Sequence, residues 1–151
     1  MPPPGTAIKS SGRPLVLGGV TIPGIAGLDG HSDADVVAHA LADALLGAAG
    51  LGDLGRHFPD TDPVWEGANS VDLLREVVRM ANAEGFVGVN ADCTVVAEAP
   101  RLAPHTEAMA ATLSAVFGGP VSVKATRGEG LGALGRAEGI ACLAVVLLDQ
   151  A

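Results

Sequence analysis

Apolar runs separated by glycine and proline divide the chain into strand-like and helix-like segments. The run 15–22, broken by Gly18-Gly19, is typical of a bent strand or a strand pair, and the runs 87–97, 121–125 and 139–148 predict single strands. Residues 33–49, 70–84 and the stretch from Pro104 to Gly118 predict three helices, each followed by a glycine. We expect residues 1–13 to be irregular and residues 23–30 and 52–67 to be loops. This order predicts an α/β (α+β) sandwich, with a mixed sheet and helices on one face.

Two details of the pattern concern the first helix and the last strand. Ser32 is followed three residues later by Asp35, a capping-box pattern that predicts Ser32 as the N-cap of the first helix. Gly50 is the expected stop of that helix. The run 139–148 is apolar on both faces, which favours a central strand covered on both sides.

Composition narrows the class of protein. The 151 residues fit one domain, 1–151, and a chain with 48% hydrophobic and 17% charged residues is not disordered. The net charge of -8 argues against nucleic-acid binding, which needs basic patches, but allows a small phosphorylated substrate held by local cations.

No signal peptide is visible and no apolar run approaches the about 20 residues of a membrane span, so we expect a cytoplasmic protein without a membrane partner. Cys93 and Cys142 are expected to be buried and reduced.

The first predicted helix carries polar residues on an otherwise apolar segment. Asp35, His39 and Asp43 are spaced four residues apart, which places them on one stripe. This spacing leaves two interpretations open, a histidine held between two carboxylates at a subunit interface and a metal ligand oriented by an aspartate. His31 and Ser32 precede the helix, where backbone N–H groups attract an anion. They either form a phosphate cradle, or Ser32 only caps the helix.

Two loops add further candidate groups. Asp53, Asp60 and Asp62 follow the first helix. Each is typical of a turn or a helix cap, while the cluster as a whole indicates hydroxyl or metal recognition. Residues 124–132 offer a cation, a hydroxyl, a carboxylate and backbone amides at a strand end. Such a set suits a diphosphate with a divalent ion, and it is also compatible with an ordinary glycine-rich turn.

Four longer motifs resemble one known family. They are residues 30–48, 51–55, 58–63 and 135–141, and the similarity extends from Arg13 to the C-terminus. On these residues the chain is similar to the 2-C-methyl-D-erythritol 2,4-cyclodiphosphate synthase family. The resemblance implies a ferredoxin-like subunit that forms a homotrimer with active sites between subunits. It also implies a lyase reaction of isoprenoid precursor synthesis, in which a CDP-linked methylerythritol 2-phosphate closes on its own β-phosphate and releases CMP.

The resemblance also implies roles for individual residues. His31 and Ser32 match the residues at the β-phosphate and are expected to be catalytic, and Asp35 is a further expected catalytic residue. His39 matches one of three zinc ligands, and Glu129 matches the ligand of a second divalent ion, Mg or Mn. The expected contacts to ribose, methylerythritol, cytidine and phosphate, together with the basic residue of a cavity on the trimer axis, are Asp53, Gly55, Phe58, Asp60, Ala97, Pro100, Arg101, Leu102, Ala103, Thr126 and Arg136.

The sequence departs from the family at its metal motif. The family's N-terminal Asp-x-His falls on Ala7 and Lys9, and residues 1–28 contain no Asp, Glu, His or Cys. Because a tetrahedral zinc needs three protein ligands of these types, we expect that the chain binds no zinc. Arg127 stands where the family has a threonine. Lys9 and Arg127 are therefore added to the expected catalytic residues, as side-chain cations that replace metal charge.

Three functions remain open at this point. The chain can be an enzyme that catalyses the family's reaction without zinc. It can instead be a diverged paralogue acting on another CDP-linked or diphosphate substrate, or a non-catalytic trimer that binds nucleotide. The intact region 30–62 favours the first two, and the altered segments favour the last two. Release of CMP from the family substrate separates them.

Overall fold

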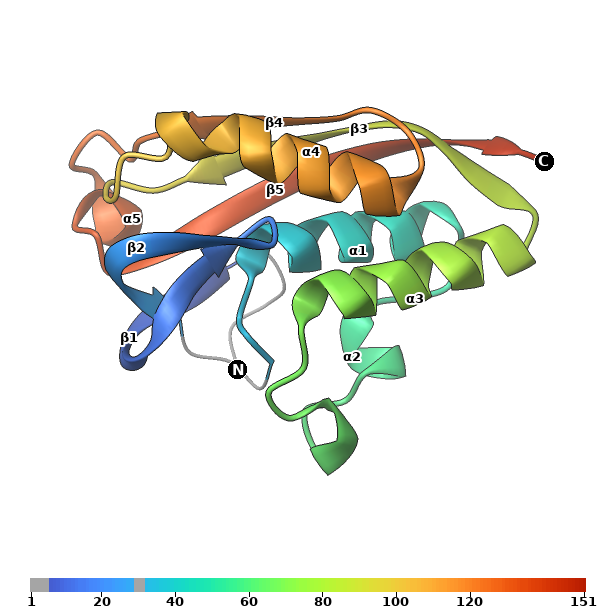
Figure 1. Cartoon of the computed structure of the whole chain (residues 1–151), viewed down its shortest axis with the longest axis horizontal. Helices are drawn as coiled ribbons and strands as arrows, with labels where there is room; N and C mark the ends of the chain where they lie inside the picture. The colour runs from blue at the N-terminus through green and yellow to red at the C-terminus, as the bar shows by residue number, and fades with distance from the viewer. Residues whose placement is uncertain (1–5, 29–31) are drawn as a thin grey trace.

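Five strands form one mixed sheet, and the longer helices lie on one side of it (Figure 1). The computed structural model describes residues 6–28 and 32–151. The strands are β1 Thr6–Leu17, β2 Val20–Leu28, β3 Phe86–Val96, β4 Val121–Thr126 and β5 Gly139–Gln150. The helices are α1 Val36–Ala48, α2 Leu54–His57, α3 Ser70–Ala83, α4 Thr106–Phe117 and α5 Gly132–Gly135, with short 3₁₀ turns η1 Pro63–Trp65 and η2 Ala103–His105.

The strand order in the sheet is β2-β1-β5-β3-β4. The pairs β1–β2, β1–β5 and β3–β5 are antiparallel, whereas β3 and β4 are parallel neighbours joined through α4. Parallel strands end at the same edge of a sheet, so the residues that follow β3 and β4 are brought side by side. The predicted mixed sheet with helices on one face is confirmed.

The core lies between the sheet and helices α1, α3 and α4. Eight of the 13 residues of α1 are buried, among them Leu41, Leu45 and Leu46, and the helix packs against β5 and α3. A helix that is apolar over most of its circumference is covered on several sides. Cys93 and Cys142 are free and buried, as predicted, and contact with the Cys93 thiol together with burial raises the pKa of Cys142. None of the described helices is long and apolar enough to span a membrane.

Three predicted boundaries are wrong. The chain is already extended from Thr6, within the stretch expected to be irregular, because residues 6–8 pair with β5. The expected loop 23–30 is strand as far as Leu28, since β2 continues along β1 through a register shift. The first helix begins at Val36, and its N-cap is Asp35 instead of Ser32. Glycine stops the predicted helices where expected, most clearly at Gly118, which adopts the left-handed conformation.

The expectation that β5 is covered on both faces is also wrong for the single chain. Leu143, Val145 and Leu147 alternate along β5 with exposed fractions of 64%, 71% and 54%. Side chains two residues apart share a face of a strand, so these three form one apolar row. All the described long helices lie on the opposite side of the sheet (Figure 1). We refer to this row as the open sheet face.

Candidate active site

Asp35 connects the β1–β2 turn to the start of α1. Its carboxylate accepts hydrogen bonds from the backbone N–H groups of Gly18 and Gly19 at 2.8 and 2.7 Å, and from those of Val37 and Ala38 at 3.1 and 3.0 Å. The side chain is fully buried. Burial raises the pKa of Asp35 to about 6, although these backbone N–H groups act in the opposite direction. All the contacts recorded for this carboxylate are structural, so the predicted catalytic role of Asp35 gains no support from them.

Asp35, His39 and Asp43, which the spacing places on one stripe of the helix, have different hydrogen-bond partners in the structure. Asp35 holds the hairpin turn, and Asp43 accepts a hydrogen bond of 3.1 Å from the N–H of Leu54, which fixes the start of α2. His39 instead contacts serine hydroxyls. The hydrogen bonds of His39 therefore go to serine hydroxyls, and the interpretation of a histidine between two carboxylates at a subunit interface stays a prediction.

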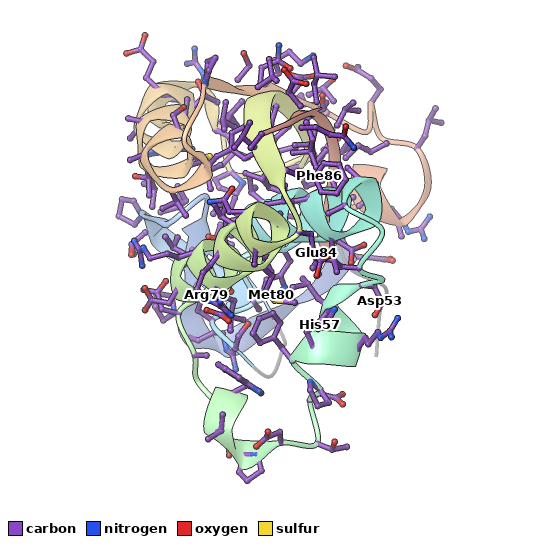
Figure 2. The ribbon with its side chains drawn as sticks, turned by 90° about the vertical axis from the view of Figure 1, so that its right-hand side faces the viewer. Asp53, His57, Arg79, Met80, Glu84 and Phe86 are labelled. Carbon is purple, nitrogen blue, oxygen red and sulfur yellow. The ribbon has the colours of Figure 1, made fainter. Side chains whose placement is uncertain are left out.

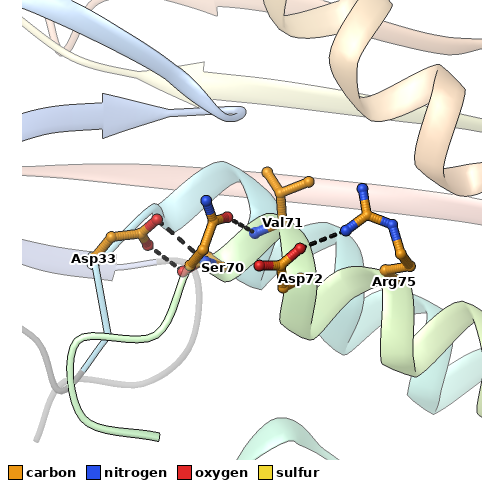
Figure 3. A network of polar contacts seen from close by, with 6 residues as sticks. Asp33, Ser70, Val71, Asp72 and Arg75 are labelled. Atoms are coloured by element: carbon orange, nitrogen blue, oxygen red, sulfur yellow. Dashed lines mark hydrogen bonds and ion pairs between the residues drawn. The ribbon is translucent and has the colours of Figure 1, made fainter.

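A cluster of polar side chains surrounds His39; we call Ser32, Asp33, His39 and Ser70 the serine–histidine cluster. The Nε2 atom of His39 lies 2.7 Å from Ser70 Oγ and 3.0 Å from Ser32 Oγ. Ser70 Oγ donates a short hydrogen bond to the Asp33 carboxylate, which also accepts from the Ser70 N–H at 3.1 Å (Figure 3). Residues from before α1 and from the first turn of α3 are thus tied together.

The hydrogen-bond pattern assigns the tautomer of His39. A serine hydroxyl has one hydrogen, and Ser70 donates it to Asp33. Ser70 Oγ therefore accepts from His39, so that Nε2 carries the proton and Nδ1 is the acceptor of the ring. Burial lowers the pKa of His39, while the Asp33 and Asp43 carboxylates act in the opposite direction.

The aspartates after α1 act mainly as caps. Asp53 caps α2 by accepting from the Arg56 N–H at 3.0 Å, and Asp62 caps η1 by accepting from the Val64 N–H at 3.0 Å. Figure 2 shows Asp53 and His57 at the two ends of α2. Asp60 is exposed in the following turn. The turn interpretation therefore describes Asp53 and Asp62, and no carboxylate cluster forms among these described residues.

An aromatic contact shapes the same loop. The rings of Phe58 and Trp65 pack edge to face with centroids 4.9 Å apart. His57 binds the carbonyl of Leu51 through Nε2 at 2.7 Å. These contacts stabilise the α2–η1 loop, which carries the predicted ribose and methylerythritol contacts Asp53, Gly55, Phe58 and Asp60.

The loops after β3 and β4 meet at one edge of the sheet; we call residues 97–103 and 126–129 the strand-end loops. The Ala97 N–H donates to the Thr126 carbonyl at 3.0 Å, and the Glu98 carboxylate accepts from the Gly128 N–H at 2.9 Å. The predicted cytidine and phosphate contacts are thereby brought together, namely Ala97, Pro100, Arg101, Leu102, Ala103, Thr126, Arg127 and Glu129. Ala97 and Leu102 are buried, whereas Arg101, Arg127 and Glu129 are exposed.

The remaining predicted residues lie elsewhere. Arg136 is exposed after α5 and pairs with Glu138 at 2.8 Å. His31 lies outside the described residues, and for Lys9 only the position in β1 is described.

Comparison with known proteins gives the family. A model of the YgbB family matches residues 6–149. The chain belongs to the YgbB family. It is 61% identical over 140 residues to the 2-C-methyl-D-erythritol 2,4-cyclodiphosphate synthase of Symbiobacterium thermophilum, covering 91% of this chain and 89% of that protein.

Solved structures of the family agree with the fold. The bifunctional IspDF of Campylobacter jejuni matches with a TM-score of 0.92 and 42% identity, over 97% of this chain and 40% of that one. A 2C-methyl-D-erythritol-2,4-cyclodiphosphate synthase in a CDP-bound form matches with a TM-score of 0.86 and 40% identity, over 95% of both chains. The resemblance drawn from the four sequence motifs is thus confirmed at the level of the family.

Two contributors to the site were not predicted from the sequence. The sequence places Ser70 only at a helix start, yet the residue is 1% exposed and its hydroxyl contacts three polar side chains. Glu98 holds the two strand-end loops together. Ser70 lies 31 residues from His39, so only the three-dimensional packing of α3 on α1 places it there.

Proposed function

We propose that the chain is a 2-C-methyl-D-erythritol 2,4-cyclodiphosphate synthase, a lyase that converts a CDP-linked methylerythritol 2-phosphate to the cyclodiphosphate and CMP. The observation that carries the proposal is the meeting of the strand-end loops, which the Glu98–Gly128 bond connects at the ends of two parallel strands. Ligands of α/β sheets bind at such strand ends. The CDP-bound relative supports a cytidine diphosphate group as the ligand.

In this reaction the main role of the protein is to position the 2-phosphate and the β-phosphate of the substrate. An oxygen of the 2-phosphate forms a bond to the β-phosphorus, and the bond from that phosphorus to the oxygen shared with the α-phosphate breaks. CMP leaves with that electron pair. Loops that hold both ends of a flexible substrate convert this step into a pre-oriented intramolecular reaction, and nearby cations offset the repulsion between phosphates.

A divalent ion fits at Glu129. Mg²⁺ in such sites is bound by one or two carboxylates together with substrate phosphates. Glu129 presents a single exposed carboxylate in the strand-end loops, two residues after Arg127. Mg or Mn bound there would neutralise phosphate charge during the reaction.

We also propose a homotrimer in which neighbouring chains complete each site. The α2–η1 loop, with the proposed ribose contacts, and the strand-end loops, with the proposed cytidine contacts, lie on different sides of one chain (Figure 1). A site shared between chains would bring the two sets of contacts onto one nucleotide. The open sheet face supplies an apolar surface of the kind that subunit interfaces cover.

Release of CMP tests the proposal. The full-length chain is incubated with the CDP-linked methylerythritol 2-phosphate and Mg²⁺ or Mn²⁺, and both products are followed by chromatography. We expect stoichiometric CMP and cyclodiphosphate. Absence of turnover with every metal, accompanied by tight CDP binding, would favour the non-catalytic trimer instead. Turnover of only another CDP-linked compound would favour the paralogue.

A further inference from the structure

The β1–β2 hairpin lies against the start of α1 through Asp35, on the side where the family's N-terminal zinc motif is expected. Residues 6–28, which form this hairpin, contain no Asp, Glu, His or Cys. His39 can supply one ligand through Nδ1. Within the described part of the chain, no three side chains of metal-ligating type come together. The chemistry of these donors does not fit a zinc ion, which needs three protein ligands.

The surroundings of His39 nevertheless require positive charge if a phosphate is to bind there. Asp33 belongs to the serine–histidine cluster, and Asp35 and Asp43 lie on the same helix start and stripe. Carboxylates at such short range repel a phosphate dianion unless a cation offsets them.

Arg13 supplies a cation at this place. Its Nη1 atom donates a hydrogen bond of 2.6 Å to the carbonyl oxygen of Ser32. The register between β1 and β2 shifts between Lys9 and Pro14, so β1 is irregular at Arg13. A β-bulge of this kind redirects side chains, and here the guanidinium reaches the backbone of a residue in the serine–histidine cluster.

A guanidinium suits this role better than the cations expected from the sequence. It stays charged at all physiological pH values and matches phosphate geometry through several N–H groups. Arg127 lies in the strand-end loops, away from the serine–histidine cluster along the chain. Arg13 lies within one hydrogen bond of that cluster.

We propose that Arg13 takes the place of zinc in this chain and binds a substrate phosphate beside Ser32 and His39. The inference deepens the proposed function, on which it rests for the identity of the phosphate. Ser32 and His39 then supply hydrogen-bonding groups beside the phosphate, and the Arg13 guanidinium offsets the negative charge of Asp33 and of the phosphate.

Zinc content and pyrophosphate binding test the inference without relying on turnover. The purified full-length chain is exposed to Zn²⁺, dialysed, and analysed by elemental mass spectrometry; we expect far less than one zinc per chain. Calorimetry then measures pyrophosphate affinity in metal-free buffer for the native chain and for Arg13→Gln, Arg13→Lys and Lys9→Gln. Arg79→Gln is the matched control, because Arg79 is exposed on α3 and paired with Glu76.

Loss of a charge-assisted hydrogen bond predicts that Arg13→Gln weakens pyrophosphate binding about 10- to 100-fold. Arg13→Lys should retain more affinity than Arg13→Gln, and Arg79→Gln should bind like the native chain. One zinc per chain, native affinity in Arg13→Gln, or a loss confined to Lys9→Gln would each overturn the inference. If these binding results hold but no CMP is released, the inference stands and the proposed function fails.

Discussion

The buried carboxylate of Asp35 makes stability depend on pH in a defined direction. Its pKa is raised from 3.8 to about 6 in the folded chain, so folding favours the protonated form. The stabilisation from this proton is complete below pH 3.8 and is lost as the pH rises through 6, a change of about 3 kcal/mol in the free energy of unfolding.

Asp35→Asn should remove this dependence. We expect the stability difference between the native chain and the variant, measured by urea unfolding, to change steadily from pH 4 to pH 6.5. Asp149→Asn, at an exposed position near the C-terminus, is the control and should show no such trend. A native-minus-Asp35→Asn difference that stays constant over this range would contradict the buried-carboxylate account.

Ser70 offers a second prediction at the scale of one residue. Ser70→Ala removes the hydroxyl that bonds Asp33 and His39, and it leaves their polar atoms without that partner in a buried place. We expect the free energy of unfolding to fall by about 1–3 kcal/mol, the cost of unsatisfied buried polar groups. Ser122→Ala, at an exposed position of β4, should change it by less than about 0.5 kcal/mol. Equal stability of the two variants would show that the cluster contributes nothing measurable.

At the scale of elements, local sequence signals predicted most helices and strands. Glycine after Ala49, Glu84 and Phe117 marks helix ends because it adopts left-handed backbone conformations without strain. Boundaries that depend on contacts with distant parts of the chain were not predicted correctly. Thr6 extends only because β5 lies beside it, and Asp35 displaces Ser32 as the N-cap because the Gly18-Gly19 turn supplies two further N–H donors.

In the site, too, the residues within local motifs were predicted, whereas those brought in by contacts between distant segments were not. Ser32 and His39 stand within a motif typical of the family, residues 124–132 were a candidate set at a strand end, and residues 97–103 followed from the resemblance. Arg13 and Ser70 reach the serine–histidine cluster across 19 and 31 residues of chain, through a strand irregularity and a helix–helix contact. Such contacts between distant residues cannot be predicted from a local sequence pattern.

The glycine-rich turn before β5 gives a prediction at this scale. A Cβ atom at Gly135 would lie 2.3 Å from the carbonyl carbon of Gly130, a contact that backbone cannot relieve without moving. Gly135→Ala should displace the segment that follows the strand-end loops and weaken CDP binding, measured by calorimetry, about tenfold, with overpacking costing about 1–3 kcal/mol of stability.

Gly47→Ala is the matched control for that change. Gly47 lies in α1 with no atom within 4 Å of the added methyl group. Alanine should stabilise this helix by about 0.5–1 kcal/mol and leave CDP binding unchanged. Unaltered CDP affinity in Gly135→Ala would separate the glycine-rich turn from the nucleotide site.

At the scale of the whole molecule, the open sheet face explains why β5 is apolar on both sides. One side of β5 packs on α1, and the other exposes Leu143, Val145 and Leu147. A contiguous apolar row of this kind is unfavourable in water and is typical of a surface that another chain covers. The prediction of a strand covered on both faces therefore applies to the proposed trimer, with the second cover supplied by neighbouring chains.

A charge on this face should dissociate the assembly. Val145→Glu places a carboxylate at the centre of the row, where an interface would have to bury it without a partner. We expect the native chain to sediment as a trimer and the variant as a monomer, with loss of CMP release because each site needs two chains. Val64→Glu is the matched control, since Val64 is 70% exposed on η1, away from the sheet. A native chain that sediments as a monomer, or a Val145→Glu variant that remains trimeric, would refute assembly through this face.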